Sequence, residues 1–206
     1  DDAGFARPVR SGTVRATPEA DFTAKVDVTG LAPGRTYFYR FGFGTLFSSV
    51  GRTRTLPAAG VSGVRLAVFS CANFPAGYFN VYADAARQDD IDCALHLGDY
   101  LYEYAKDGYA SAQSAALGRV SVPANELVTL SDYRRRYAQY RSDPDLQAVH
   151  AAMPMIAVWD DHEVANNAWR DGAENHDPAS EGPYAARRAA ALLAYHEWLP
   201  IRLPDP

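Results

Sequence analysis

Three short apolar runs, in which apolar residues do not alternate with polar ones, dominate the sequence after residue 64. The runs are Leu66–Ser70, Cys93–Leu97 and Met155–Trp159, and stretches with the apolar spacing of helices separate them. Strands of a parallel sheet lie between helices and are continuously apolar, whereas half-buried antiparallel strands alternate. The pattern therefore predicts an α/β domain whose parallel sheet is covered on both faces.

Helical spacing of apolar residues identifies four segments after residue 64, which are Tyr78–Asp89, Ser131–Arg141, Asp145–Ala152 and Tyr184–Trp198. In the second of them, Tyr133, Tyr137 and Tyr140 form one stripe, so we expect the arginines Arg134–Arg136 mostly on the solvent side. Residues 103–129 show no periodicity and follow the second apolar run directly. A connection of that length predicts a loop that borders a functional site.

The first 56 residues predict β-structure of a different kind. Phe22–Val28 alternates apolar and polar residues, Arg35–Phe43 carries aromatic residues with period two, and Ser49–Thr55 is a further expected strand. Pro33-Gly34 predicts a tight turn, and Tyr37 is placed to return its hydroxyl to that turn, as in the tyrosine corner of sandwich domains. We therefore expect 1–56 to be part of a β-sandwich that resembles fibronectin type III or immunoglobulin-like domains, with its first strands missing.

Composition and charge argue against a membrane-spanning, a nucleic-acid-binding and a disulfide-rich protein. The 206 residues carry a net charge of −5 and no apolar run long enough to cross a bilayer, and no nucleic-acid-binding surface is evident. Two cysteines are too few for a disulfide scaffold. No signal peptide precedes Asp1, so the sequence itself leaves the compartment open.

Polar side chains follow each of the three apolar runs, where each strand is expected to end. They are Cys71 after the first run, Asp99 and Tyr102 after the second, and Asp161 and His162 after the third. Because parallel strands bring their carboxyl ends to one edge, these side chains are expected in one crevice. Carboxylates in a partly dry crevice repel one another unless cations neutralise them, so the arrangement predicts a metal site.

The donor types leave the metal open. A thiolate, a phenolate and an imidazole suit a transition metal such as Fe(III), while carboxylates and amides also suit Ca²⁺, Mg²⁺ or Mn²⁺. Two cations that share Asp99 would hold a hydroxide and clamp the oxygens of a phosphoryl group. Each residue also has a plainer interpretation, since Asp99 suits a helix N-cap and Tyr102 suits packing.

The segment Gly98-Asp99-Tyr100-Leu101-Tyr102 looks like the GDxxY motif of purple acid phosphatases and their relatives. With the segments 69–73, 96–103 and 159–167, it resembles the alkaline phosphatase D (PhoD-like) family of metallophosphoesterases. The resemblance extends from about Thr13 to Trp198. It implies a four-layer α/β/β/α metallophosphatase fold, of which residues 64–206 would be the first part, after a linker at 57–63.

The resemblance also implies an activity. It implies a metal-dependent hydrolase of phosphomonoesters and phosphodiesters, which uses a metal-bound hydroxide at a dinuclear site and is exported to the periplasm or the cell exterior. The implied cofactors are Fe³⁺ and Ca²⁺, with Mn²⁺ or Zn²⁺ as alternatives. The implied metal ligands are Cys71, Asp99, Tyr102, Asp161 and Asn166. Asp99 would bridge the two metals, and His162 would stabilise the transition state or protonate the leaving oxygen; Asn73 is a weaker candidate for amide contacts.

This sequence departs from the family pattern after Trp198, where no Asp-x-His segment supplies the further ligands that the family uses. We therefore expect both domains to be incomplete and these 206 residues alone to be weakly active or inactive. Two other functions remain open. A non-enzymatic extracellular binding or adhesion module would explain the sandwich-like first part, and a metallohydrolase of carbon esters would use similar residue types. Neither the natural substrate nor the oligomeric state is predicted.

Overall fold

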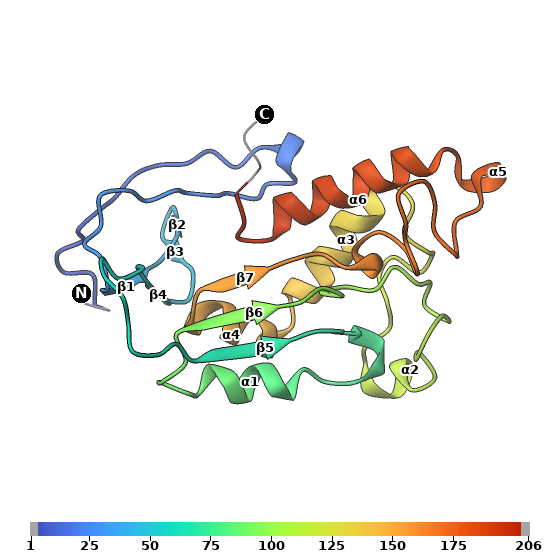
Figure 1. Cartoon of the computed structure of the whole chain (residues 1–206). Coiled ribbons are helices and arrows are strands. Elements are labelled where there is room, and N and C mark those ends of the chain that lie inside the picture. The colour runs from blue at the N-terminus through green and yellow to red at the C-terminus, as the bar shows by residue number, and fades with distance from the viewer. Residues whose placement is uncertain (1–3, 203–206) are drawn as a thin grey trace.

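The computed structural model describes residues 4–202. Residues 64–202 form a three-stranded parallel sheet with helices packed against it (Figure 1). The strands, in spatial order, are β5 (Leu66–Phe69), β6 (Cys93–His96) and β7 (Met155–Ala157). All three lie within the predicted runs. Phe69 pairs with His96, and His96 pairs with Ala157, so the three strands end side by side at one edge.

Four helices occupy the segments predicted from apolar spacing. They are α1 (Asn80–Ala86), α3 (Leu130–Arg141), α4 (Pro144–Ala152) and α6 (Tyr184–Trp198), with the short helices α2 (Ser114–Leu117) and α5 (Pro178–Glu181) between them. Thr129 and Asp132 form a capping box at the start of α3, and Asp143 caps α4 ahead of a proline. Helix α1 packs on α4, and α3 packs on α6.

The core lies between the sheet and these helices. Its buried members run from Ala72 to Leu199, and they include the stripe of Tyr133, Tyr137 and Tyr140 predicted for α3, each fully buried. His96 is also fully buried, and its Nε2 lies 2.9 Å from the hydroxyl of Tyr82 on α1. The inner face of the sheet is therefore a packed interior.

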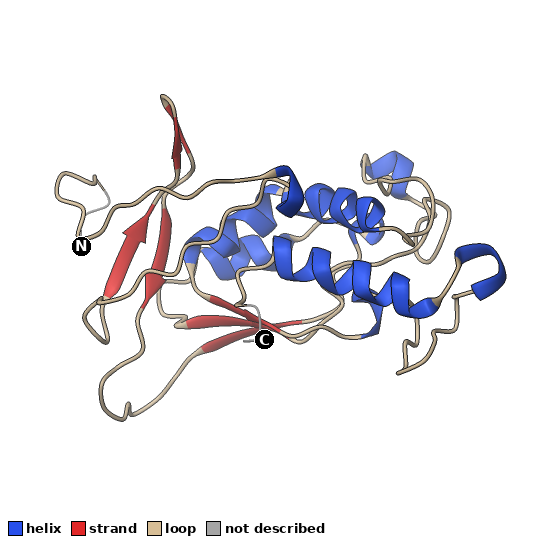
Figure 2. Cartoon of the chain, turned by 90° about the horizontal axis from the view of Figure 1, so that it is seen from above, coloured by secondary structure: helices blue, strands red, loops and turns tan. Residues whose placement is uncertain are grey.

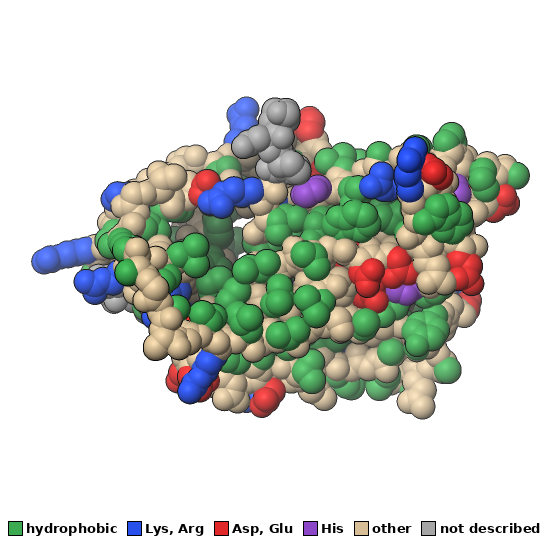
Figure 3. All heavy atoms as spheres, in the orientation of Figure 1, with side chains coloured by type: hydrophobic (Ala, Val, Ile, Leu, Met, Phe, Trp, Pro, Cys, Tyr) green, Lys and Arg blue, Asp and Glu red, His purple; other side chains and the backbone are tan. Residues whose placement is uncertain are grey.

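The prediction that helices cover both faces of the sheet is wrong for the described residues. Figure 2 shows the three parallel strands along one edge of the molecule, with the long helices on one side of them. In Figure 3 hydrophobic side chains gather over the outer face of the sheet. Val68, Ile156 and Val158 on that face are 55%, 57% and 48% exposed. Strands that do not alternate have two apolar faces. None of the helices that the structure describes packs on the outer face of this sheet.

The first part of the chain forms two small antiparallel sheets (Figure 1). One pairs β1 (Thr36–Tyr39) with β4 (Gly51–Arg54), and the other pairs β2 (Gly42–Phe43) with β3 (Leu46–Phe47). A 3-10 turn, η1, spans Pro18–Ala20. The predicted tyrosine corner is confirmed, because the backbone N–H of Ala32 donates to the hydroxyl of the buried Tyr37 at 2.9 Å.

Phe22–Val28 does not form the strand that its alternation predicted. Its alternate residues Phe22, Val26 and Val28 are exposed, and no described strand pairs with the segment. An alternating segment forms a strand only where a neighbouring strand pairs with its backbone N–H and C=O groups. Here the segment is instead contacted by side chains, such as that of Arg202, which forms an ion pair with Asp27. The observed fold is thus mixed α/β, and none of its described helices is long and apolar enough to span a membrane.

Candidate functional site

The loops that follow the three parallel strands meet at one end of the sheet, as predicted from the strand-end residues. The loop after β5 is tied to the loop after β6, because Ala72 donates its backbone N–H to the carbonyl of Asp99 at 2.8 Å. The loop after β7 begins with the 3-10 turn η3 (Asp161–Glu163). Figure 3 shows acidic side chains and a histidine clustered at this end.

Asp99 lies at the centre of the cluster. Its Oδ2 accepts hydrogen bonds from the thiol of Cys71 at 3.3 Å and from the hydroxyl of Tyr102 at 3.2 Å. Its Oδ1 is buried and has no hydrogen-bond partner among the described residues. Burial raises the pKa of Asp99, although the hydrogen bond from Cys71 lowers it. A buried carboxylate oxygen without a partner is unfavourable unless a cation or a proton reaches it.

Asp161 and His162 complete the cluster from the loop after β7. One ligand atom from each of Asp99, Asp161 and His162 lies within 4.8 Å of the other two, which is close enough for a single cation to contact all three. Cys71 and Tyr102 join this group through Asp99. Four of the five metal ligands implied by the resemblance are therefore brought together with His162.

Asn166, the fifth implied ligand, lies at the edge of the cluster. Its backbone N–H donates to Glu103 at 2.7 Å, and its role as a ligand stays a prediction. Asn73 uses its side-chain amide to donate to the carbonyl of Tyr109 at 3.4 Å, while its own side-chain oxygen is buried without a partner among the described residues. Both asparagines thus border the site.

Close backbone approach brings the second and third loops together at Gly98. A Cβ atom there would lie 2.4 Å from the Cβ of Asp160, so only glycine fits. Cys71 and Asp99 adopt positive φ angles of 58° and 52°, a region that non-glycine residues seldom occupy. Such backbone strain is tolerated where the surrounding contacts hold it, and it clusters at functional sites.

Glu163 holds the loops together from beneath the site, a role that sequence reasoning missed. Its buried carboxylate accepts the backbone N–H groups of Asp99 at 3.0 Å, Tyr100 at 2.6 Å and Asp160 at 2.7 Å. Burial raises the pKa of Glu163 to about 7, although these hydrogen bonds lower it. The spacing Asp160-x-x-Glu163, typical of a capping box, is the sequence pattern that indicates a backbone-binding role for Glu163.

Glu103 orients His162 and was also missed as a functional residue. Its Oε2 lies 2.8 Å from Nδ1 of His162, and the carboxylate is fully buried. Burial alone would lower the pKa of His162, but the hydrogen bond and the charge of Glu103 outweigh burial and raise it. With Nδ1 engaged by Glu103, Nε2 is the ring nitrogen left for a ligand.

A buried network extends from Glu103 to helix α6. The other Glu103 oxygen accepts the amide of Asn175 at 2.7 Å, Asn175 donates to Glu126 at 3.0 Å, and Glu126 pairs with Arg187 at 2.8 Å. Arg187 is fully buried and belongs to α6. No sequence pattern links these residues, which come from three distant segments, so only the fold brings them together.

Arg136 is an exception to the expectation that Arg134–Arg136 lie mostly on the solvent side of α3. It is fully buried, and its guanidinium donates to the carbonyls of Tyr102, Tyr104, Val122 and Pro123. The apolar stripe of α3 predicts only that the tyrosines are buried. An arginine beside the stripe can also be buried when backbone carbonyls accept hydrogen bonds from its guanidinium. Arg136 thereby anchors the segment that follows Asp99.

Comparisons with known proteins place the chain in a family. Residues 66–206 match the family model of the PhoD-like phosphatase, and residues 1–57 match that of the PhoD-like phosphatase N-terminal domain. The sequence is 42% identical over 204 residues to alkaline phosphatase D of Bacillus subtilis (strain 168), which covers 98% of this chain and 34% of that protein.

A solved structure described as the structure of PhoD superposes with a TM-score of 0.88 at 40% identity, covering 99% of this chain and 39% of the other. The chain therefore spans between a third and two fifths of the length of these relatives. Since one family model matches more than half of the residues, the chain belongs to the PhoD-like phosphatase family.

Proposed function

We propose that this chain carries part of the active site of a metal-dependent phosphoric ester hydrolase that acts on phosphomonoesters or phosphodiesters. The observation that supports this proposal most is the convergence of Asp99, Asp161 and His162, whose ligand atoms lie within 4.8 Å of one another. A phosphate ester needs positive charge around its oxygens, and two carboxylates that are buried or half-buried side by side need it as well. A cation at this position satisfies both requirements.

The described residues place suitable donor atoms for a metal close together. Asp99 offers the buried Oδ1 that lacks a hydrogen-bond partner, and Cys71 and Tyr102 offer a thiol and a phenol beside its Oδ2. We propose Cys71, Asp99 and Tyr102 as ligands of Fe³⁺, and Asp161 with Asn166 as ligands of Ca²⁺, with Asp99 shared. Mn²⁺ or Zn²⁺ are alternatives for the same donor set.

The protein's own residues would divide the chemistry as follows. Bound cations would supply the charge that activates water and stabilises the phosphoryl oxygens. His162, held through Nδ1 by Glu103, would use Nε2 to donate a proton to the leaving oxygen as the P–O bond breaks. Glu163 accepts the backbone N–H of Asp99 and so fixes the main chain from which this carboxylate projects.

Several further parts of the proposal concern the longer protein. We propose that 1–56 is a partial sandwich, 57–63 a linker and 64–206 the first portion of the catalytic domain, and that the protein is exported. We also expect these 206 residues alone to hydrolyse p-nitrophenyl phosphate weakly or not at all, because the relatives are between two and three times as long.

Metal binding by the purified 206-residue chain tests the site directly. We expect calorimetric titration with Mn²⁺ to show a specific site. Asp99→Asn should lower the affinity for Mn²⁺ more than about tenfold, because mutating even a residue that only hydrogen-bonds a metal ligand lowers metal affinity by roughly 10–100-fold. Asp107→Asn, which removes an exposed carboxylate of the neighbouring loop, is the matched control and should leave the affinity unchanged. Equal affinities in all three proteins would refute the site and favour the non-enzymatic module.

A further inference from the structure

Four aromatic rings form a continuous cluster beside the carboxylates of the candidate site. The ring of Tyr102 lies 4.2 Å from that of His162, centroid to centroid, and the ring of Tyr104 lies 5.4 Å from His162. Tyr109 lies 6.3 Å from Tyr102, nearly parallel to it, and 5.9 Å from Tyr104. The cluster thus extends from His162 along the loop that follows β6.

Local structure places Tyr109 at this position. The backbone N–H of Gly108 donates to the carbonyl of Ala105 at 2.9 Å, which closes a tight turn between the two outer tyrosines. A Cβ on Gly108 would lie 2.6 Å from the Cβ of Tyr104, so the turn requires a residue without a side chain. Asn73 then ties the carbonyl of Tyr109 to the loop after β5.

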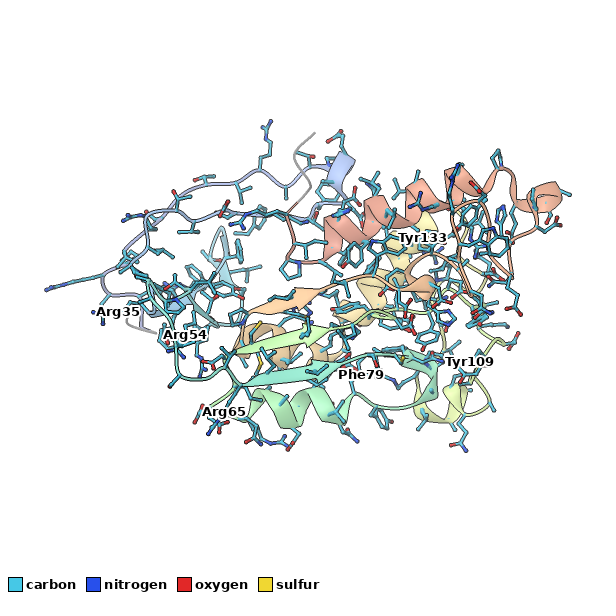
Figure 4. All side chains as sticks on the ribbon, in the orientation of Figure 1. Arg35, Arg54, Arg65, Phe79, Tyr109 and Tyr133 are labelled. Carbon is cyan, nitrogen blue, oxygen red and sulfur yellow. The ribbon has the colours of Figure 1, made fainter. Side chains whose placement is uncertain are left out.

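The cluster is held on its inner side and open on its outer side. Arg136 anchors the carbonyls of Tyr102 and Tyr104 from within the core. Tyr102 is buried, Tyr104 is half-buried, and Tyr109 is 63% exposed. Figure 4 shows Tyr109 at the end of the molecule where the parallel strands end. An exposed ring with a fixed backbone offers a preformed face to a ligand at little cost in conformational entropy.

We propose that Tyr104 and Tyr109 form a stacking surface for the planar aromatic group of a phosphate ester whose phosphoryl group lies at Asp99, Asp161 and His162. The inference rests on the proposed hydrolase function and adds a substrate class, that of aryl or similarly planar leaving groups. His162 contacts Tyr104 and Tyr102 and also belongs to the carboxylate cluster, so a group leaving from phosphorus beside His162 emerges next to these rings.

Two phosphonates of matched size separate stacking from general apolar contact. Phenylphosphonate and cyclohexylphosphonate have six-carbon rings, but only the phenyl ring is planar and aromatic. With Mn²⁺ present, we expect the 206-residue chain to bind phenylphosphonate about fivefold more tightly than cyclohexylphosphonate in calorimetric titrations, the ratio that an aromatic pair adds beyond its buried area.

Variants assign the preference to the rings. Tyr109→Ala should bring the two affinities together, whereas Tyr109→Phe, which keeps the ring and removes the hydroxyl, should retain the preference. Phe43→Ala removes an aromatic ring that is 88% exposed on β2, in the first part of the chain, and should keep the wild-type ratio. Thermal unfolding of each variant verifies that it is folded, as expected for changes at exposed side chains.

Each outcome decides the proposal. Equal binding of both phosphonates would overturn the stacking surface and leave the proposed hydrolase site standing. A preference that survives in Tyr109→Ala and in Tyr104→Ala would overturn the assignment to these residues. Failure of the metal-loaded chain to bind either phosphonate would overturn both the stacking surface and the phosphoester site on which it rests.

Discussion

Residues 4–56 and residues 64–202 differ in what holds them in place. In the first region only Tyr37 and Gly51 are buried, and the aromatic residues Phe41 and Phe43 remain exposed. In the second region a continuous core extends from Ala72 to Leu199. Buried apolar area dominates folding stability, so the second region supplies nearly all of it.

Polar contacts attach the first region to the second. Arg54 pairs with Asp92 before β6, Trp198 donates to Asp21 at 3.1 Å, and Arg134 donates to the carbonyl of Glu19 at 2.6 Å. Partly exposed contacts of this kind contribute little to stability. The comparison teaches that the candidate site depends on a core of its own, to which the first region is added.

The largest expected effect tests where the stability lies. Leu146 on α4 is 1% exposed, and Leu146→Ala should lower the free energy of unfolding by about 2–5 kcal/mol through lost burial and a cavity. Phe43→Ala in the first region should change it by less than about 0.5 kcal/mol. Urea denaturation followed by circular dichroism measures both. Similar losses in the two variants would contradict the difference between the regions.

Acid should destabilise the second region through His96, which is fully buried in its core. Burial lowers the pKa of His96 from 6.5 to about 4. As the pH falls below 6.5, the unfolded chain gains a proton at His96 that the folded chain does not, so stability declines until the folded form also protonates near pH 4. Through His96 alone, the free energy of unfolding should fall by roughly 3 kcal/mol over this pH range.

Urea denaturation at pH 7.5 and at pH 4.5 measures that loss, and His96→Gln should reduce it. The remaining decline would come from other groups, including His150, whose pKa burial also lowers. If His96→Gln loses as much stability on acidification as the wild-type chain does, His96 is not the group responsible.

The smallest expected effect concerns the tyrosine corner of the first region. Tyr37→Phe removes the hydrogen bond from the N–H of Ala32 and should lower local stability by about 1 kcal/mol. Hydrogen exchange at the amide of Ala32 reports it, and faster exchange there with unchanged exchange in α3 is the expected result. Tyr39→Phe on the same strand, whose hydroxyl makes only a 3.5 Å contact, is the control. Equal protection in both variants would show that the corner does not stabilise this region.

Periodicity predicted most elements of the second region because their own apolar residues form the core. The expected runs became β5, β6 and β7, and Tyr184–Trp198 became α6 with identical bounds. The same reasoning failed at Phe22–Val28, which alternates but has no strand beside it. It also failed at the outer face of the sheet, since a pattern that indicates two apolar faces does not say which segment covers each.

The sequence by itself determined the parallel strands, the polar residues at their ends and the resemblance of those residues to a metallophosphoesterase site. These features follow from local spacing and from the rule that parallel strands end at one edge. Only the tertiary structure decided that Glu103 orients His162, that Arg136 is buried, and that Tyr109 lies beside Tyr102 and is tied to Asn73. Glu103 and His162 are 59 positions apart, Arg136 and Tyr102 are 34 apart, and Asn73 and Tyr109 are 36 apart. Such pairings depend on how the whole core packs rather than on any local pattern.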